Sequence, residues 1–252
     1  MVQGALRCLD AARRCEHAHL LAADDCRYLF EYHPGRYRAG GSPGGASAGA
    51  GGSDSASDSA GSGGGSSGAI RRLIGNFKCP PTVAAASAVR LHYKECAIEQ
   101  IAAALRAGAR RAFVEAATWV PIPPSAASGA PDYDDRLART LQRAFAGYDL
   151  DVRRLLRQTR STAPDHRGTR RLPIPALLGL IHLEERELAA RPLRSRIVLF
   201  DDVLTTGKHY RCCERRLHES LPEVPVCGCF IARRALPSSA RGAADVPVCY
   251  AK

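Results

Sequence analysis

Residues Ile197–His209, Ile-Val-Leu-Phe-Asp-Asp-Val-Leu-Thr-Thr-Gly-Lys-His, decide the fold that we expect for this chain. The four apolar residues Ile197–Phe200 predict a strand buried on both faces, as in a parallel sheet. Thr205, Thr206 and Gly207 are typical of a tight turn that opens a helix. The segment therefore predicts a strand, a loop and a helix in succession, which is the repeating unit of an α/β protein.

Strand and helix patterns alternate on both sides of this segment. Apolar residues recur at helical spacing over 84–105 and 132–145, and a third helix is expected over 207–221. Strands are expected over 113–122 and 226–232. This order predicts an α/β fold, a parallel sheet flanked by helices. In such sheets ligands bind beyond the carboxyl ends of the strands.

The chain divides by composition into four parts. Residues 1–38 predict a helix and a hairpin on the core, with two strands in Cys26–Arg38 joined at His33-Pro34-Gly35. Residues 39–69 are rich in Gly, Ser and Ala and predict a disordered insertion, since they can bury little apolar area. Residues 70–236 form the main domain, and 237–252 a C-terminal tail.

Composition excludes several classes of protein. The 252 residues contain no apolar run long enough for a membrane span and no secretory pattern at the N-terminus. The ten cysteines are scattered, so we expect them to be reduced, in a cytoplasmic protein. The net charge of +11 comes almost wholly from arginine, since only Lys78, Lys94, Lys208 and Lys252 are lysines. Arginine favours phosphate-rich partners, and a GC-rich coding bias explains the same excess.

The residues after the buried strand predict a sugar-phosphate site. Asp201 and Asp202 are adjacent anions that need ribose hydroxyls or a divalent cation such as Mg²⁺ as partners. Thr205, Thr206 and Gly207 precede a helix whose free N–H groups and positive dipole end favour an anion. A diol-binding pair followed by a phosphate loop fits a ribose 5-phosphate group.

Two other interpretations of the segment stay open. An apolar strand that ends in Asp-Asp also occurs in P-loop ATPases, but Gly207-Lys208 lacks the upstream Gly and the following Ser or Thr of that motif. The plain structural alternative is an ordinary strand-to-helix turn with a capping threonine.

The segment resembles the PRPP-binding signature of type I phosphoribosyltransferases, an apolar strand followed by two acids, two variable residues and Thr-Gly. With Ile70–Lys78, Trp119–Ser125 and an Arg-rich stretch around His166–Arg171, residues from roughly 70 to 235 look like the bacterial competence-protein ComF-type subgroup. The resemblance implies a phosphoribosyltransferase-like fold that binds PRPP or a nucleotide. It implies catalytic and Mg²⁺-binding roles for Asp201 and Asp202. It implies substrate contacts at Val203, Leu204, Thr205, Thr206, Gly207, Lys208 and His209.

The same resemblance assigns roles elsewhere in the chain. The loop with Pro123, Pro124 and Ser125 would hold pyrophosphate and Mg²⁺; the alternative is a plain strand terminator. Asp132, Asp134 and Asp135 are interpreted as acids at a helix N-terminus rather than as metal ligands. Arg136 in that helix is a candidate phosphate contact.

An Arg-rich stretch, residues 153–171, carries seven arginines and one acid. In the family a basic loop closes over PRPP at this place, which would exclude water and neutralise pyrophosphate. The loop would contribute His166, a candidate catalytic residue, and the substrate contacts Arg167, Arg170 and Arg171. A solvated basic loop and a patch for single-stranded DNA are the alternatives.

Two departures limit the expected reaction. Thr205 stands where purine-salvage relatives have a general base, and His209 stands where a phosphate-binding hydroxyl is usual. We therefore expect an enzyme of nucleotide metabolism that transfers phosphoribosyl to an unknown acceptor and releases pyrophosphate. The alternative is a PRPP or nucleotide sensor without catalysis, or a ComF-like accessory protein of DNA uptake or processing. A homodimer is left open.

The N-terminal segment contains Cys and His residues that raise the question of zinc. ComF-type proteins often carry a zinc module there, built from C-x-x-C pairs, and this segment has no such pair. Cys8 and Cys15 fit a helical pattern with Leu6 and Leu9 instead. We favour no zinc site in the set Cys8, Cys15, His17, His19 and Cys26.

Overall fold

The computed structural model describes residues 5–32, 64–162 and 172–235. The strands are β1 (Arg7–Cys8), β2 (Cys26–Tyr32), β3 (Ala117–Pro121), β4 (Asp151–Val152), β5 (Leu156–Gln158), β6 (Ile181–Leu183), β7 (Arg196–Leu204) and β8 (Val226–Arg234). The helices are α1 (Ala11–Arg14), α2 (Gly64–Phe77), α3 (Pro81–Ala85), α4 (Ala88–Gly108), α5 (Arg111–Glu115), α6 (Arg136–Ala144), α7 (Ile174–Leu178), α8 (Glu185–Ala189) and α9 (Lys208–Ser220).

A mostly parallel six-stranded sheet organises the protein. Its order is β1-β2-β8-β7-β3-β4, and only the β1–β2 pair is antiparallel. A separate antiparallel pair, β5–β6, lies beside it. The expected α/β fold with a parallel sheet flanked by helices is confirmed at this level.

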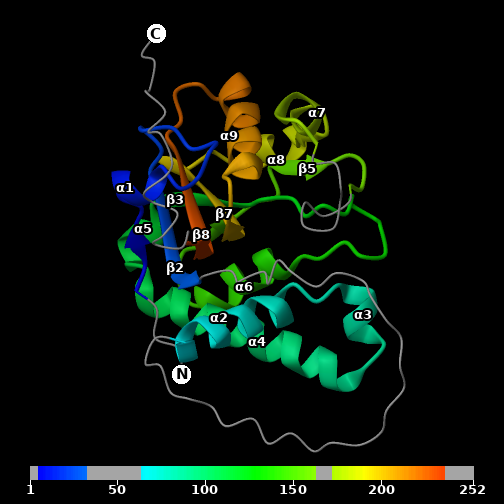
Figure 1. Ribbon diagram of the computed structural model, residues 1–252. Coiled ribbons are helices and arrows are strands. Elements are labelled where there is room, and N and C mark those ends of the chain that lie inside the picture. The colour runs from blue at the N-terminus through cyan, green and yellow to red at the C-terminus, as the bar shows by residue number, and fades with distance from the viewer. Residues whose placement is uncertain (1–4, 33–63, 163–171, 236–252) are drawn as a thin grey trace, which may run out of the picture.

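Helices cover both faces of the sheet (Figure 1). On one face α2, α4 and α6 pack over a core that includes Phe77, Ile101, Trp119 and Phe200. On the other face α9 and α7 cover a second core that includes Leu199. Val198 and Phe200 belong to the first core and Ile197 and Leu199 to the second, as the alternation of strand side chains requires. The apolar run at 197–200 is therefore a strand buried on both faces, as its sequence predicts.

One expected strand differs from the structure. The apolar run at 113–122 begins as the short helix α5, and only its second half forms strand β3. The first strand of the hairpin expected in Cys26–Arg38 is present as β2, which pairs in parallel with β8 and antiparallel with β1. The second half and its turn at His33-Pro34-Gly35 lie outside the described residues. Tyr28, Leu29 and Phe30 explain the inner position of β2, since all three are buried.

The boundaries of the N-terminal helix and of the Gly/Ser-rich insertion also differ from those expected from the sequence. Helix α2 begins at Gly64, so the end of the expected insertion at 39–69 is helical, whereas residues 39–63 lie outside the described ranges. Cys8 is in strand β1 and Cys15 caps α1, so the helical pattern expected through both is wrong. Most of the expected tail, 237–252, is also undescribed.

Other observations complete the fold. The predicted helices correspond to α4, α6 and α9, whereas β4, β5, β6, α7 and α8 were not predicted. Among the described residues no helix has the length and apolar character needed to cross a membrane. The nine described cysteines are free thiols, five of them buried.

Candidate functional site

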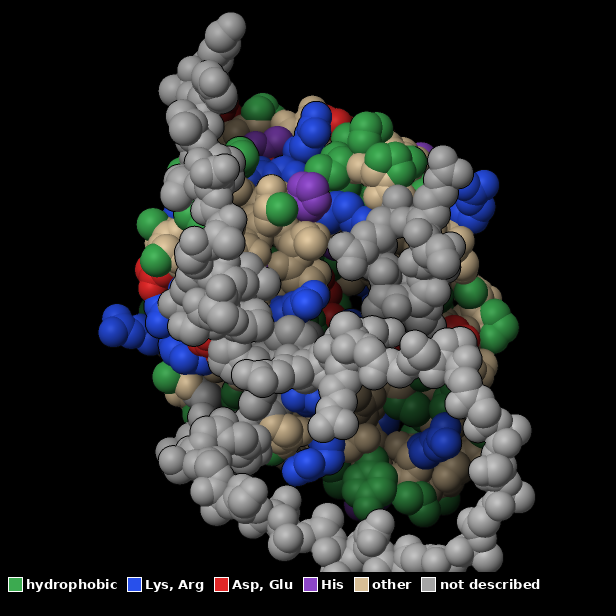
Figure 2. Space-filling view, viewed as in Figure 1, with side chains coloured by type: hydrophobic (Ala, Val, Ile, Leu, Met, Phe, Trp, Pro, Cys, Tyr) green, Lys and Arg blue, Asp and Glu red, His purple; other side chains and the backbone are tan. Residues whose placement is uncertain are grey.

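The topology places the predicted segments at one edge of the sheet. From β3 the chain moves outward to β4 on one side, and from β7 it moves to β8 on the other, so the order reverses between the neighbours β3 and β7. Ligands of such sheets bind outside the carboxyl ends of the strands at this reversal. Both the loop after Ile122 and the loop after Leu204 leave from that edge. In the space-filling view, Lys and Arg side chains are visible in the middle of the molecule, between the two layers of helices (Figure 2).

Strand β7 does not end at the two acids. It continues through Asp201 and Asp202 to Leu204, because β8 pairs with it as far as Arg233. Successive side chains of a strand point to opposite faces, so the two carboxylates lie on different sides of the sheet. Asp201 and Asp202 therefore do not share one ligand-facing side at the end of the strand, as their sequence suggested.

Asp202 is tied to two cations. Its carboxylate accepts from Lys78 Nζ at 2.9 Å and from Arg136 Nη2 at 2.5 Å, on the side covered by α2 and α6. Burial disfavours the charged form, but Lys78 and Arg136 outweigh it and hold the pKa of Asp202 well below its ordinary value. Asp202 is thus a charged member of a buried ion-pair network.

Asp201 forms no ion pair with a described side chain, although the charges of Lys78 and Arg136 also act on it. It faces the α9 side, where its charge acts on the thiol of Cys213, and its Oδ1 accepts from the Asp202 N–H at 2.7 Å. Burial and the neighbouring Asp202 carboxylate raise the pKa of Asp201 to about 7. A carboxylate in this state gains from hydroxyl donors or a cation that a ligand supplies.

The ion-pair network continues behind Asp202. Arg136 also donates to Asp134 at 3.0 Å, and Lys94, only 3% exposed, donates to Asp134 at 2.6 Å. Asp134 is buried in these ion pairs, and its Oδ1 also accepts from the Arg136 backbone N–H at 3.1 Å, as expected for an acid at the N-terminus of this helix. Asp135 precedes α6 as its N-cap residue, and Asp132 accepts from Thr82 Oγ1.

Sequence reasoning missed Lys78 and Lys94. One signal could have found them: in a chain whose basic residues are nearly all arginine, only four are lysine. Lys78 and Lys94 contact the network, and Lys208 opens α9 at the predicted phosphate loop. The three described lysines thus all lie in or next to the candidate site.

The loop between β7 and α9 has the conformation that its sequence predicts. Gly207 adopts the left-handed region at φ 78°, and α9 begins at Lys208. A side chain at Gly207 would also collide with Leu20, whose Cδ2 lies 2.8 Å from the ideal Cβ position. Among the described residues, the N–H groups of Thr206 and Gly207 have no hydrogen-bond acceptor.

The neighbouring predicted contacts are placed differently. Leu204 is buried in the core and Val203 packs against the opposite core. Lys208 is 8% exposed, and its Nζ donates to the carbonyl of Leu172 at 3.1 Å. The Lys208 side chain therefore links the loop to the chain just after residues 163–171. His209 is partly buried on the first turn of α9.

The loop after β3 lies at the same edge. Ile122 N–H still donates to the Phe200 carbonyl at 2.9 Å, and the chain then turns away at Pro123 and Pro124. The Ser125 carbonyl accepts from Gln158 Nε2 and from Thr162 N–H, both at 2.8 Å. Ser125 is thus fixed to β5 through its backbone.

The Arg-rich stretch is only partly a loop. Arg153, 3% exposed, holds Asp151 with two nitrogens and donates to the carbonyls of Arg191 and Pro192, so it has a structural role. Arg157 pairs with Glu184 from strand β5. The candidates His166, Arg167, Arg170 and Arg171 lie outside the described residues.

The N-terminal segment with its Cys and His residues lies beside the β7–α9 loop. The described residues contain no group of three or more His, Cys, Asp or Glu arranged to hold a metal ion. His17 is buried and contacts the carbonyl of Thr205, and the His19 N–H donates to the carbonyl of Thr206 at 2.9 Å. The N-terminal segment therefore forms hydrogen bonds with the β7–α9 loop. The spacing of its Cys and His residues in the sequence did not predict these contacts.

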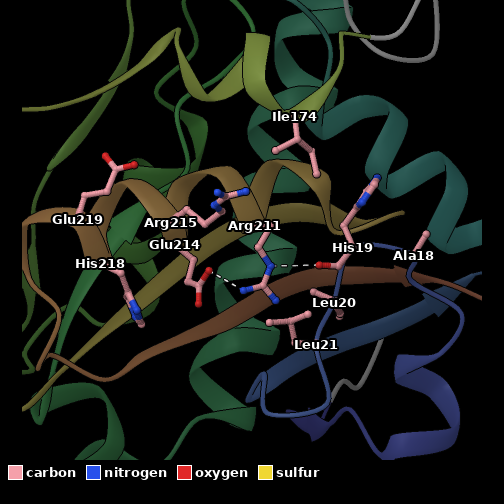
Figure 3. Close-up of a pocket in the computed structure, with 10 residues that line it drawn as sticks. All are labelled: Ala18, His19, Leu20, Leu21, Ile174, Arg211, Glu214, Arg215, His218 and Glu219. Atoms are coloured by element: carbon pink, nitrogen blue, oxygen red, sulfur yellow. Dashed lines mark hydrogen bonds and ion pairs between the residues drawn. The ribbon is translucent and has the colours of Figure 1, made fainter. Parts of the chain in front are cut away.

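A groove of about 720 Å³ lies beside this segment (Figure 3). Arg211 crosses it, donating to the His19 carbonyl at 3.2 Å and to Glu214 at 2.6 Å. Its walls come from the N-terminal segment, α7 and α9: Ala18, His19, Leu20, Leu21, Ile174, Arg211, Glu214, Arg215, His218 and Glu219. The two carboxylates of β7 are not among its lining residues, so the groove is separate from the predicted site.

Comparison with known proteins gives no independent assignment. No family model matches the chain, and no similar curated protein or solved structure was found.

Proposed function

We propose that this protein binds a 5-phosphorylated ribose, in PRPP or a nucleotide, at the carboxyl edge of β7. The observation that carries the proposal is the β7–α9 loop. Its left-handed Gly207 opens a helix of 13 residues, and the Thr206 and Gly207 N–H groups lack an acceptor among the described residues. Successive backbone N–H groups at a helix N-terminus form an anion site. A phosphate ester is the anion that this loop suits.

Asp201 supports the sugar part of the proposal. It lies four residues before Thr205, the first residue of the loop's Thr205–Thr206–Gly207 sequence, and its pKa is raised because burial and Asp202 disfavour its charge. Two ribose hydroxyls would donate to this carboxylate and relieve that cost. Asp202 holds Lys78 and Arg136 in place behind it, so its role in the proposal is to keep cations close to the ligand.

Mg²⁺ fits this site as a companion of the ligand. In nucleotide and phosphate sites Mg²⁺ often binds through one or two carboxylates together with the substrate's phosphates, and Asp201 offers one carboxylate. When bound, the ion would neutralise charge on a departing pyrophosphate. The chain's own contribution would be to orient the ribose through Asp201 and the phosphate through the loop.

Transfer of phosphoribosyl to an acceptor, with release of pyrophosphate, is the reaction that we propose for this site. The second candidate is binding without transfer, as in a PRPP or nucleotide sensor. The paired state of Asp202 favours this second candidate, because both of its oxygens are engaged by Lys78 and Arg136. Only Asp201 is then left to stabilise positive charge on the ribose.

A binding titration tests the proposal. Calorimetry with PRPP, with and without Mg²⁺, is expected to show binding that weakens at least tenfold in Asp201→Asn, equal to about 1.4 kcal/mol. Asp149→Asn is the matched control, because Asp149 is 79% exposed and lies before β4, at the opposite edge of the sheet. Its affinity should equal that of the wild type.

Pyrophosphate release then separates the two candidate functions. Release with one of a panel of bases supports transfer, whereas binding without release supports a sensor. Failure of the wild type to bind either PRPP or ribose 5-phosphate would overturn both. Binding only of single-stranded DNA, in a salt-dependent manner, would instead favour an accessory role on nucleic acid.

A further inference from the structure

The N-terminal segment His17–Leu20 lies directly on the β7–α9 loop. The His17 ring nitrogen Nδ1 donates to the carbonyl of Thr205, and the His19 N–H donates to the carbonyl of Thr206 at 2.9 Å. Leu20 packs on the Cα of Gly207, where a Cβ would lie 2.8 Å from its Cδ2. Three consecutive loop residues are thus each contacted by residues almost 190 positions earlier in the chain.

These contacts fix the direction of the loop's N–H groups. In a trans peptide the N–H of one residue points away from the carbonyl of the residue before it, and all described peptides are trans. The Thr205 and Thr206 carbonyls face the N-terminal segment, so the N–H groups of Thr206 and Gly207 point to the opposite side. The segment therefore holds two successive donors side by side and turned away from it.

The segment is itself anchored on its far side. Arg211 of α9 donates to the His19 carbonyl at 3.2 Å and pairs with Asp24 (Figure 3 shows the first contact). Asp24 in turn accepts from the Leu21 N–H at 2.6 Å. Arg211 of α9 thus fixes the N-terminal segment, and this segment in turn contacts the loop that precedes α9.

His17 is suited to be a fixed donor. It is 1% exposed, and a carbonyl oxygen only accepts, so Nδ1 carries the hydrogen. Burial lowers the pKa of His17 and outweighs the hydrogen bond to Thr205, which raises it. The ring therefore favours its neutral form, in which the hydrogen on Nδ1 is the donor to Thr205.

We propose that His17 is a positioning residue for a phosphate ester: it holds the Thr205 peptide so that the Thr206 and Gly207 N–H groups face the ligand. The inference rests on the proposed function, because it explains what holds the loop that we propose binds the phosphate. It predicts that the N-terminal segment determines affinity for the phosphate group without contacting it. Affinity for the sugar alone does not depend on His17.

Two substitutions separate positioning from packing. His17→Leu keeps apolar volume and removes the donor, whereas His17→Asn keeps a donor near the Nδ1 position. Leu9→Ala is the matched control, since Leu9 is 2% exposed in the same core and its hydrogen bonds are to Cys26 and Arg14 rather than to the loop. Thermal unfolding of each variant gives its loss of stability.

The measurement is calorimetric affinity for ribose 5-phosphate and for ribose. His17→Leu is expected to weaken ribose 5-phosphate binding about tenfold and leave the affinity for ribose unchanged. His17→Asn should restore binding to within about threefold of the wild type, and Leu9→Ala should lose stability but not affinity. A loss of packing alone would not weaken ribose 5-phosphate binding selectively and would not be reversed by His17→Asn.

The outcomes distinguish the two proposals. If the wild type binds ribose 5-phosphate and His17→Leu binds it equally well, the positioning role is wrong and the proposed function stands. If the wild type does not bind, the proposed function fails and this inference fails with it. Should His17→Leu not fold, Leu20→Ala replaces it, because it removes the contact on Gly207 and is expected to weaken binding in the same selective way.

Discussion

Two adjacent aspartates of one strand occupy opposite electrostatic states. Asp202 lies against Lys78 and Arg136, which hold its pKa well below the ordinary value, whereas burial beside Asp202 raises the pKa of Asp201 to about 7. The alternation of strand side chains causes the difference, because it turns only Asp202 toward the cations of α2 and α6. Asp202 thus stabilises the fold, whereas the charge of Asp201 costs free energy.

Asp202→Asn is expected to destabilise the protein by about 1–3 kcal/mol near neutral pH, because it removes the carboxylate that pairs with Lys78 and leaves Arg136 with Asp134 alone. A depressed pKa gives stability above the ordinary value of 3.8 that is lost as pH falls below it. Urea unfolding at pH 7 and at pH 3.5 measures this, and the difference from the wild type should shrink in acid. Equal stability at pH 7 would contradict the network.

Asp201→Asn is expected to have the opposite effect on the protein without ligand. A raised pKa means that the folded state favours the neutral acid, so stability is highest below 3.8 and is lost as pH rises through about 7. Removing the charge should therefore increase the free energy of unfolding by ~2 kcal/mol at pH 8 and change it little at pH 4. Urea unfolding across this range checks it. Destabilisation at pH 8 would show that Asp201 has a partner.

At the residue scale the sequence predicted the turn at Gly207 but not the ion pairs of Asp202. Gly207, needed for the left-handed turn, follows from its place between Thr206 and a helix. The ion pairs of Asp202 could not be predicted in this way, because Lys78 and Arg136 are 124 and 66 residues away from it in the sequence. Such long-range partners depend on how helices pack over the sheet, which local pattern does not encode.

At the scale of elements, the start of α9 depends on the fit between Gly207 and Leu20. Gly207→Ala is expected to cost about 1–2 kcal/mol for a side chain in the left-handed region, and more because its Cβ would meet Leu20. Leu20→Ala should recover the steric part only. A double-mutant cycle by urea unfolding is expected to give a coupling of about 1 kcal/mol. Strict additivity would show that Leu20 does not touch the loop.

Helices and strands could be predicted where the apolar residues follow one clear spacing or form a continuous run. Helices α6 and α9 have apolar residues on one face, and β7 and β8 each contain a continuous apolar run. Helix α4 is predicted less well, because it buries Ile101 and Leu105 but exposes Val89 and Tyr93. The run at 113–122 was misjudged because apolar runs have no period that separates a helical turn from a strand. Strands β4, β5 and β6 have two or three residues each, too short for any pattern.

At the scale of the whole molecule, the N-terminal region belongs to the main sheet. Strand β2 pairs with β8 along its length, and Arg233, fully buried, depends on Glu16 and Glu31 from the N-terminal region for its ion pairs at 2.7 and 2.5 Å. A main domain that starts at residue 70 therefore lacks an interior strand and two counter-ions.

A chain that starts at Gly64 is accordingly expected not to fold. Circular dichroism and urea unfolding should show no cooperative transition, since β8 has lost a neighbour and Arg233 is left as a buried charge. Adding residues 1–38 as a separate fragment is the control and should restore the transition. Cooperative unfolding of the truncated chain alone would contradict this.

The pairing of β2 with β8 also sets the order of events during synthesis. Cys26 pairs with Gly228, so one of the first strands made waits for roughly two hundred further residues before its partner exists. At about 5–20 residues per second, translation leaves that apolar strand unpaired for ten seconds or more. The sheet can close only when β8 has left the ribosome. Closure of the sheet therefore follows the synthesis of β8, and in the interval β2 is an unpaired apolar strand of the kind that chaperones bind.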